Sequence, residues 1–190
     1  MRIGIDAHIL GKQKGGVEHT VEVLIRGLAA ADLENAYVIY TTELHPFAPG
    51  ELPPNFHLRL LPHASPWISR LMMPYYYGRD RLDVLYLQRA TPLFGCPNTV
   101  LHVHDAMYAT HPHLFPFWKR MVLNTLFRYS GKRAKVVVTP TEASRAEIER
   151  AYGIAREKIH VLPDTVDRRE LYPESNAELL ADAQQRFGVS

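Results

Sequence analysis

Two histidines and an aspartate near the middle of the chain are the residues best suited to chemistry. His102, His104 and Asp105 stand at the end of a short apolar run. Alternation along a strand puts His102 and His104 on one face and Asp105 just beyond the strand. Two imidazoles and a carboxylate could hold zinc, with His111 and His113 as further ligands. Alternatively, His104 could contact a sugar in a polar cleft, or both histidines of the run could be structural.

A glycine-bearing loop, Gly11–Gly16, is the second candidate. Gly15 and Gly16 would let the backbone approach a phosphate closely, and the start of the following helix favours an anion. The spacing is not that of the dinucleotide motif. It is not a P-loop either, because Val17 and Glu18 occupy the positions that need lysine and serine or threonine. The pattern therefore leaves a ligand-binding loop and a simple flexible turn both open.

A basic segment follows the histidines and is predicted to be helical over Leu114–Arg133. Arg120, Asn124, Arg128 and Lys132 recur every fourth residue and predict one polar, basic stripe. Such a helix can lie on an anionic membrane surface. The broad apolar remainder favours instead a core helix with a solvated charged edge.

Alternating apolar runs and helical patterns predict an α/β domain with a mostly parallel sheet of about seven strands. The predicted strands are 2–6, 36–42, 56–61, 83–87, 99–103, 135–139 and 158–162. The predicted helices are 17–31, 66–77, 114–133, 141–152 and 177–187, the fourth capped either by Thr141 or by a Ser144–Glu147 capping box and ended by Gly153. We expect a domain over 1–170, followed by a linker over 171–190.

Composition excludes several classes of protein. The net charge of +2 is too small to argue for a nucleic-acid partner. The single cysteine, Cys96, excludes an intrachain disulfide framework and fits a reducing compartment. No apolar run is long enough to span a membrane, and Asp6 and His8 interrupt the apolar N-terminus that a signal peptide would need. We therefore expect a cytoplasmic protein.

Taken in order, several motifs resemble the family 4 (group 1) retaining glycosyltransferases, which have the two-domain GT-B architecture. His104-Asp105 matches a His-Asp pair that many members carry at a strand end. Asp164-Thr165 departs from the usual Asn-Gly, and Thr141 replaces a common serine, which keeps the hydroxyl. The matching segments are Met1–Ala7, Gly15–Val21, His104–Asp105, Val137–Ser144, Tyr152–Gly153, Lys158–Pro163 and Val166–Asp167.

The resemblance implies a Rossmann-like three-layer domain that forms the N-terminal, acceptor-side half of a GT-B enzyme. It implies transfer of a sugar from a nucleotide diphosphate-sugar, with no metal and no other cofactor. Gly15 and Gly16 would lie near the donor diphosphate, and His104 near the transferred sugar as the catalytic candidate. Asp105, Thr141 and Ser144 are candidates for contact with the acceptor or the sugar.

The remaining expectations concern partners. The acceptor is expected to be a carbohydrate or a lipid-linked sugar, with a peripheral membrane contact if the basic stripe faces outward. A C-terminal domain beyond Ser190 would hold the donor, so the chain alone should be inactive. The alternatives are a free-standing nucleotide- or sugar-binding module, a sugar-nucleotide epimerase, and a metal-dependent hydrolase.

Overall fold

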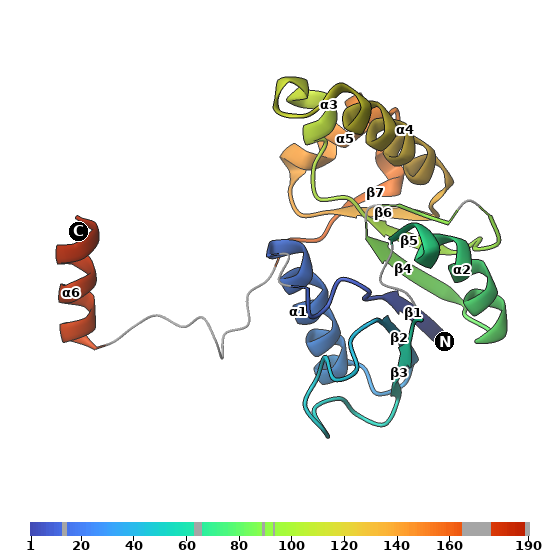
Figure 1. Ribbon diagram of the computed structural model, residues 1–190, viewed down its shortest axis with the longest axis horizontal. Coiled ribbons are helices and arrows are strands. Elements are labelled where there is room, and N and C mark those ends of the chain that lie inside the picture. Colours follow the sequence, from blue (N-terminus) through green and yellow to red (C-terminus); the bar gives the residue numbers. More distant parts are fainter. Residues whose placement is uncertain (13–14, 63–65, 89, 93, 165–175, 189–190) are drawn as a thin grey trace.

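One parallel sheet organises the molecule (Figure 1). The computed structural model describes residues 1–12, 15–62, 66–88, 90–92, 94–164 and 176–188. The strands are β1 (Arg2–Asp6), β2 (Ala36–Thr41), β3 (Phe56–Leu60), β4 (Val84–Gln88), β5 (Thr99–His102), β6 (Val136–Thr139) and β7 (Ile159–Val161). They lie in the order β3-β2-β1-β4-β5-β6-β7, and every pairing is parallel. All seven predicted strands are confirmed, with ends that shift by one residue or so.

Helices connect the strands much as the sequence predicts. They are α1 (Gly16–Ala31), α2 (Pro66–Arg79), α3 (Met107–Thr110), α4 (Phe117–Arg133), α5 (Glu142–Tyr152) and α6 (Ala177–Phe187), with 3-10 turns η1 (Pro112–Leu114) and η2 (Arg156–Lys158). The sequence did not predict α3 or the 3-10 turns. The predicted division between residues 170 and 171 lies outside the described residues.

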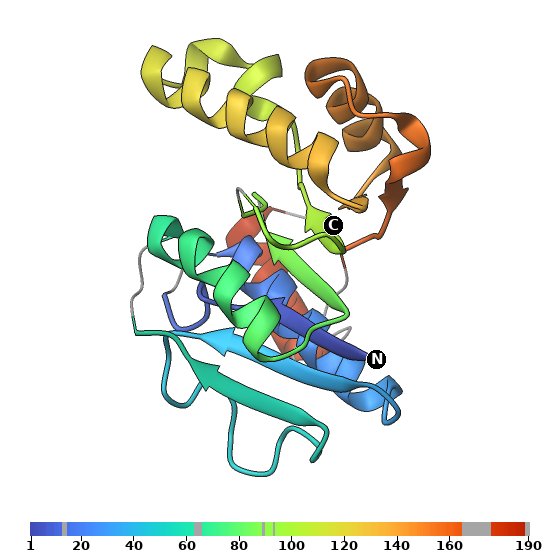
Figure 2. The ribbon, with the colours of Figure 1, turned by 90° about the vertical axis from the view of Figure 1, so that its right-hand side faces the viewer.

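Alternation along the strands feeds two separate cores, one on each face of the sheet. In β2, Tyr37 and Ile39 join the core under α1, whereas Val38 and Tyr40 join the core under α2, α4 and α5. Figures 1 and 2 show α1 on one side of the sheet and α2, α4 and α5 on the other. This is the three-layer arrangement that the sequence predicts.

The helix α4 buries less of its apolar surface than the sequence favours. Leu123 and Phe127 pack into the core, but Trp118, Val122 and Tyr129 are exposed. The predicted core helix is therefore confirmed for the side that carries Leu123 and Phe127, and the rest of its apolar surface is exposed. A seventeen-residue helix packed on one side of a sheet needs only one stripe of apolar residues, and α4 carries more than one.

Candidate functional site

The carboxyl ends of the central strands form the edge at which a ligand would bind. Strand β1 lies inside the sheet. The strands β2 and β3 are added on one side of it, and β4, β5, β6 and β7 are added in order on the other side. In open α/β sheets, ligands bind beyond the strand ends at such a switch point. The glycine loop follows β1, and both histidines lie at the end of β5, so the fold brings the two predicted motifs to one edge.

The glycine loop leaves the start of α1 open. Gly15 precedes α1 with φ 69°, a left-handed conformation that favours glycine. A Cβ atom at Gly15 or at Gly16 would meet nothing within 4 Å. The carbonyl of Gly15 accepts hydrogen bonds from the N–H groups of Glu18 and His19, at 3.0 and 3.2 Å. The positive end of the α1 dipole therefore faces open space, as a phosphate site needs.

The first turn of α1 and the end of β5 line one hollow. Val17 lies opposite His104 and Asp105 in a cavity of about 130 Å³, which Val103 and Tyr108 also line, together with Leu123 and Phe127. The helix after the glycine loop and the His-Asp pair therefore line one cavity. Its walls are mostly apolar, with His104 and Asp105 supplying the polar groups.

The two histidines stack on each other, and each has a partner on β4. Their ring centroids are 4.2 Å apart at 21°. Nδ1 of His102 lies 2.6 Å from the hydroxyl of Tyr86, and Nε2 of His104 lies 3.0 Å from Oε1 of Gln88. Since an amide oxygen only accepts, Nε2 of His104 carries the proton in this orientation of Gln88. β4 therefore fixes the orientation of both rings.

Burial keeps His102 uncharged. Its side chain is 1% exposed, and desolvation, followed by the nearby His104, lowers the pKa of His102 to about 3. Among the described residues, neither Nε2 of His102 nor Nε2 of Gln88 has a hydrogen-bond partner. Buried polar atoms are rarely left unpaired in folded proteins, so the two nitrogens mark this edge as a place where a polar ligand could complete the network.

The possible metal ligands differ from those that the zinc hypothesis named. Among the residues that the structure describes, His102, His104 and Asp164 bring one ligand atom each within 4.8 Å of one another. Asp105 is not in this group, and its Oδ1 accepts a hydrogen bond of 2.8 Å from the N–H group of Met107. Asp164 follows β7, so the carboxylate that departs from the family's Asn-Gly lies beside the histidine pair.

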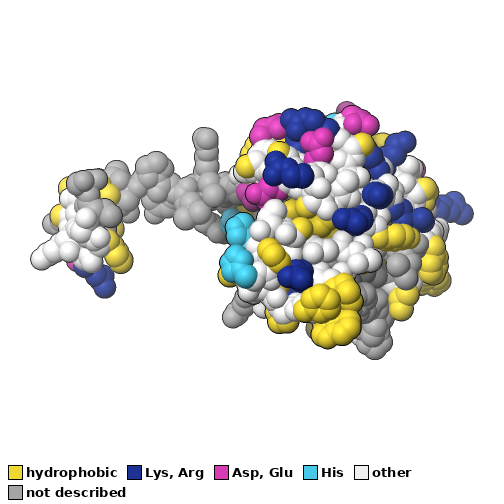
Figure 3. Space-filling model, turned by 90° about the horizontal axis from the view of Figure 1, so that it is seen from above, with side chains coloured by type: hydrophobic (Ala, Val, Ile, Leu, Met, Phe, Trp, Pro, Cys, Tyr) yellow, Lys and Arg dark blue, Asp and Glu magenta, His cyan; other side chains and the backbone are white. Residues whose placement is uncertain are grey.

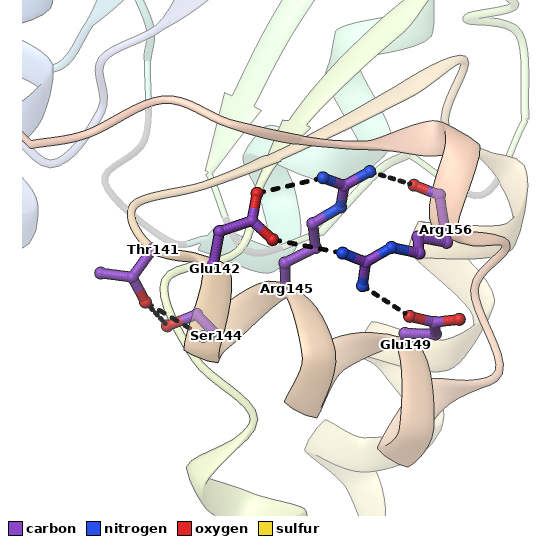
Figure 4. A network of polar contacts seen from close by, with 6 residues as sticks. All are labelled: Thr141, Glu142, Ser144, Arg145, Glu149 and Arg156. Atoms are coloured by element: carbon purple, nitrogen blue, oxygen red, sulfur yellow. Dashed lines mark hydrogen bonds and ion pairs between the residues drawn. The ribbon is translucent and has the colours of Figure 1, made fainter.

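Thr141 and Ser144 build the start of α5 (Figure 4). Oγ1 of Thr141 accepts a hydrogen bond of 3.0 Å from the N–H group of Ser144 and lies 3.0 Å from its Oγ. Thr141 is thus the cap, and the alternative capping box that begins at Ser144 does not form. Both side chains are exposed or half-buried, so their predicted contact with acceptor or sugar stays a prediction.

The same helix carries an ionic network on its outer surface. Glu142 contacts both Arg145 and Arg156, and Arg156 also contacts Glu149, at 3.1 to 3.3 Å. Arg145 further donates to the carbonyl of Arg156. The network ties α5 to η2, and its arginines are already engaged by acids, so it is a structural feature.

A second hollow lies on the other side of the glycine loop. It measures about 390 Å³, and Gly11, Glu43 and His45 lie on its wall with two residues of α1, Glu18 and Glu22. His45 begins the proline-rich segment between β2 and β3. The hollow is therefore bounded by the segments that follow β1 and β2 and by α1, and carboxylates dominate its polar lining.

Sequence reasoning missed the support that β4 gives to the histidines. Tyr86 and Gln88 stand two apart, and register places Gln88 beside His102. A polar residue that ends an otherwise apolar strand was the available signal for Gln88. Asp6 and His8, at the end of β1, form a similar pair, with Nδ1 of His8 2.7 Å from Oδ1 of Asp6.

Comparisons with known proteins find one matching family and several similar structures. The family described as Glycosyltransferase Family 4 matches residues 14–170. Two structures of HepE from Anabaena are similar, one with UDP and glucose (14% identity, TM-score 0.59) and one with UDP-glucose (15%, 0.56). Each alignment covers 99% of this chain and 50% of the HepE chain. A glycosyltransferase of Rickettsia africae is also similar (14%, TM-score 0.54), with 100% of this chain and 49% of that one covered.

The chain therefore spans about half the length of these structures, and its fold is that of a GT-B half-domain. A search of the curated proteins finds no relative of this sequence. Among the described residues, no helix has the length and apolar character that crossing a bilayer requires.

Proposed function

The chain belongs to glycosyltransferase family 4, and from this premise we propose that it is the acceptor-side half of a retaining enzyme. In this proposal, a nucleotide diphosphate-sugar lies across the carboxyl edge of the sheet. Its diphosphate is next to Gly15 and Gly16, and its sugar is beside His104. A second α/β domain holds the nucleotide, and the chain by itself does not turn over.

One observation carries the proposal: the open glycine turn and the incomplete hydrogen-bond network meet at one edge of the sheet. A diphosphate needs close backbone approach and N–H donors, which the open start of α1 offers. A sugar needs hydrogen-bond partners for its hydroxyl groups, and Nε2 of His102 and of Gln88 are unpaired among the described residues. His104, held by Gln88, would contact the sugar as it is transferred.

The proposed division of labour follows from electrostatics. Departure of a diphosphate requires positive charge or oriented dipoles where negative charge develops. In this chain the α1 dipole supplies a share, and the only acidic group in its first turn is Glu18. We expect the remaining stabilisation to come from basic residues of the other domain, without a metal or another cofactor. HepE was crystallised with UDP and with UDP-glucose, which supports a donor of this class.

The acceptor is proposed to enter through the hollow beside the β2–β3 connection. The carboxylates of Glu22 and Glu43 line this hollow and can accept hydrogen bonds from sugar hydroxyls. Gly11 also lines the hollow and has no side chain that would keep a ligand away from the backbone. At Gly11, with φ 74°, an added Cβ would come within 2.7 Å of Oε2 of Glu43. A glycine at this position therefore leaves room for the carboxylate of Glu43 where it lies.

The proposal is tested by titrating the ¹⁵N-labelled chain with UDP-glucose and following amide chemical shifts. We expect weak binding, with shifts at Gly15, Gly16 and His104, and no release of UDP. Gly15→Val should abolish these shifts. Gly50→Val is the matched control, because Gly50 has a similar φ of 79° and equally open surroundings but lies in the β2–β3 connection.

Three results would overturn the proposal. Shifts that avoid the glycine turn and the end of β5 would place the nucleotide elsewhere. Steady release of UDP by the chain alone would refute the half-site. Tight binding without turnover, insensitive to any added domain, would favour a free-standing sugar-nucleotide-binding module.

A further inference from the structure

The outer surface of α4 exposes large apolar side chains in one continuous stripe. Trp118 is 71% exposed and Phe117 57%, and Met121 and Val122 follow one turn later at 43% and 45%. Leu114 of η1, just before the helix, is also exposed. Residues spaced by three and four lie on one face of a helix, so these side chains form a single patch. Exposed apolar patches of this kind mark interaction surfaces.

The apolar side chains of this patch are not needed to complete the hydrophobic core under α4. The inward side of α4 is complete without it, since Phe127, Ser130 and Gly131 are buried and Leu123 packs beside them. An added Cβ at Gly131 would overlap Ile154, so the inner side is closely packed. The apolar stripe faces outward because the inner stripe already fills the space above the sheet.

The segment that carries the patch is basic, and no acid lies near it in sequence. Between Asp105 and Glu142 the chain contains no Asp or Glu, and its basic residues in that interval are Lys119, Arg120, Arg128, Lys132, Arg133 and Lys135. Figure 3 looks down on this side of the molecule. Hydrophobic and basic side chains are intermingled over much of the view, whereas the acidic ones gather toward one edge.

A hollow of about 340 Å³ adjoins the stripe, and two arginines line this hollow. Phe117, Met121 and Asn124 line it with Arg120 and Arg128. Arg120 lies over the ring of Phe117, at 5.5 Å from the centroid. Arg128 donates a hydrogen bond of 3.2 Å to the carbonyl of Ala151. Two guanidinium groups held in this way beside an apolar ridge match a phosphate group at the surface of an apolar layer.

We propose that this outer face of α4 docks on an anionic lipid bilayer, with Trp118 and Phe117 at the level of the headgroups. Charge decides between the possible occupants. A second copy of the chain would bring the same basic residues face to face, and like charges oppose association. An anionic bilayer pairs with the basic residues and accepts the apolar stripe at once.

Docking would bring lipid close to the proposed site without depending on it. The inner side of the same helix, through Leu123 and Phe127, lines the hollow beside His104. A bilayer on the outer side therefore lies about one helix diameter, ~10 Å, from that hollow. The residues of the patch are separate from the glycine turn, so the docking can be tested with no nucleotide present.

Vesicle binding tests the inference. The chain carrying Trp67→Phe, which leaves Trp118 as its one tryptophan, is mixed with phosphatidylcholine vesicles that contain either no charged lipid or about 30% phosphatidylglycerol. We expect co-sedimentation and a blue-shifted emission of Trp118 with the anionic vesicles only. Lys132→Glu with Arg133→Glu should weaken partitioning at least about twenty-five-fold, since each basic residue near such a surface contributes roughly a factor of five.

A matched pair of variants tests the apolar part. Met121→Ser should weaken binding severalfold. Leu33→Ser removes an exposed side chain (72%) in the bend that follows α1 and should leave binding unchanged. Equal binding to neutral vesicles, an equal effect of both variants, or no binding would overturn the inference. So would a dimer in solution that Met121→Ser dissociates while vesicles remain unbound, because the face would then join two copies.

Discussion

The protein should lose stability when the pH falls from about 7 to about 5, and replacing His102 by glutamine should make this loss smaller. His102 is buried and uncharged, with its pKa lowered from 6.5 to about 3 by desolvation and by His104. In the unfolded chain the imidazole takes up a proton near its ordinary pKa, but in the folded protein it does not until far lower pH. The unfolded state therefore binds more protons throughout this window, and stability falls as the pH falls.

The size of the effect follows from the two pKa values. One pKa unit corresponds to about 1.4 kcal/mol, so the full loss approaches ~5 kcal/mol near pH 3. The part of this loss that falls between about pH 7 and pH 5 is about 2 kcal/mol of unfolding free energy. His102→Gln should be less stable than the parent at pH 7, because the contact with Tyr86 is altered. It should then lose about 2 kcal/mol less on acidification.

Urea unfolding followed by circular dichroism at the two pH values measures this difference. Val138→Ala is the control, because Val138 pairs with His102 across β5 and β6 and is 8% exposed but does not titrate. It should lower stability by a similar amount at both pH values. If His102→Gln and the parent lose the same stability on acidification, within about 0.5 kcal/mol, the buried ring is not held neutral and the reasoning fails.

Other predictions concern the helices that position the site. Thr141→Ala should destabilise the protein by about 1 kcal/mol, because it removes the cap of α5, while Ser144→Ala keeps the cap and should cost much less; equal losses in thermal unfolding would contradict the assigned cap. Gly27→Ala should stabilise by up to about 1 kcal/mol, since α1 is open there. Gly131→Ala should instead destabilise by roughly 1–2 kcal/mol, because the new methyl group overlaps Ile154, and a gain at both glycines would show that this packing is loose.

The order and type of the elements could be predicted because they depend on local patterns. The run Val136–Thr139 is apolar and β-branched, and Gly153 stops α5 in a left-handed conformation that suits glycine. The 3-10 turns and α3 were missed because short turns leave little periodic signal. The proline and the histidine of η1 are also common in loops.

The candidate site was predictable in part, since its glycine turn and its histidines follow predicted strands. Alternation correctly put His102 and His104 on one face, and their rings stack. The partners on β4 were not predictable, because register between strands joins Gln88 to His102 across many residues of sequence. The carboxylate beside the histidines was assigned to Asp105, but Asp164 fills that place from the end of β7.

The sequence by itself determined the parallel sheet and the edge at which its chemistry gathers. Periods of two and of 3.6 and the position of glycine are properties of neighbouring residues. Only the tertiary structure decided that His102 is buried while Trp118 is exposed. Both stand in largely apolar surroundings in the sequence, yet α4 has apolar residues on two sides and the sheet can cover one of them. Which side is covered depends on how helix and sheet pack together, and no local pattern contains that information.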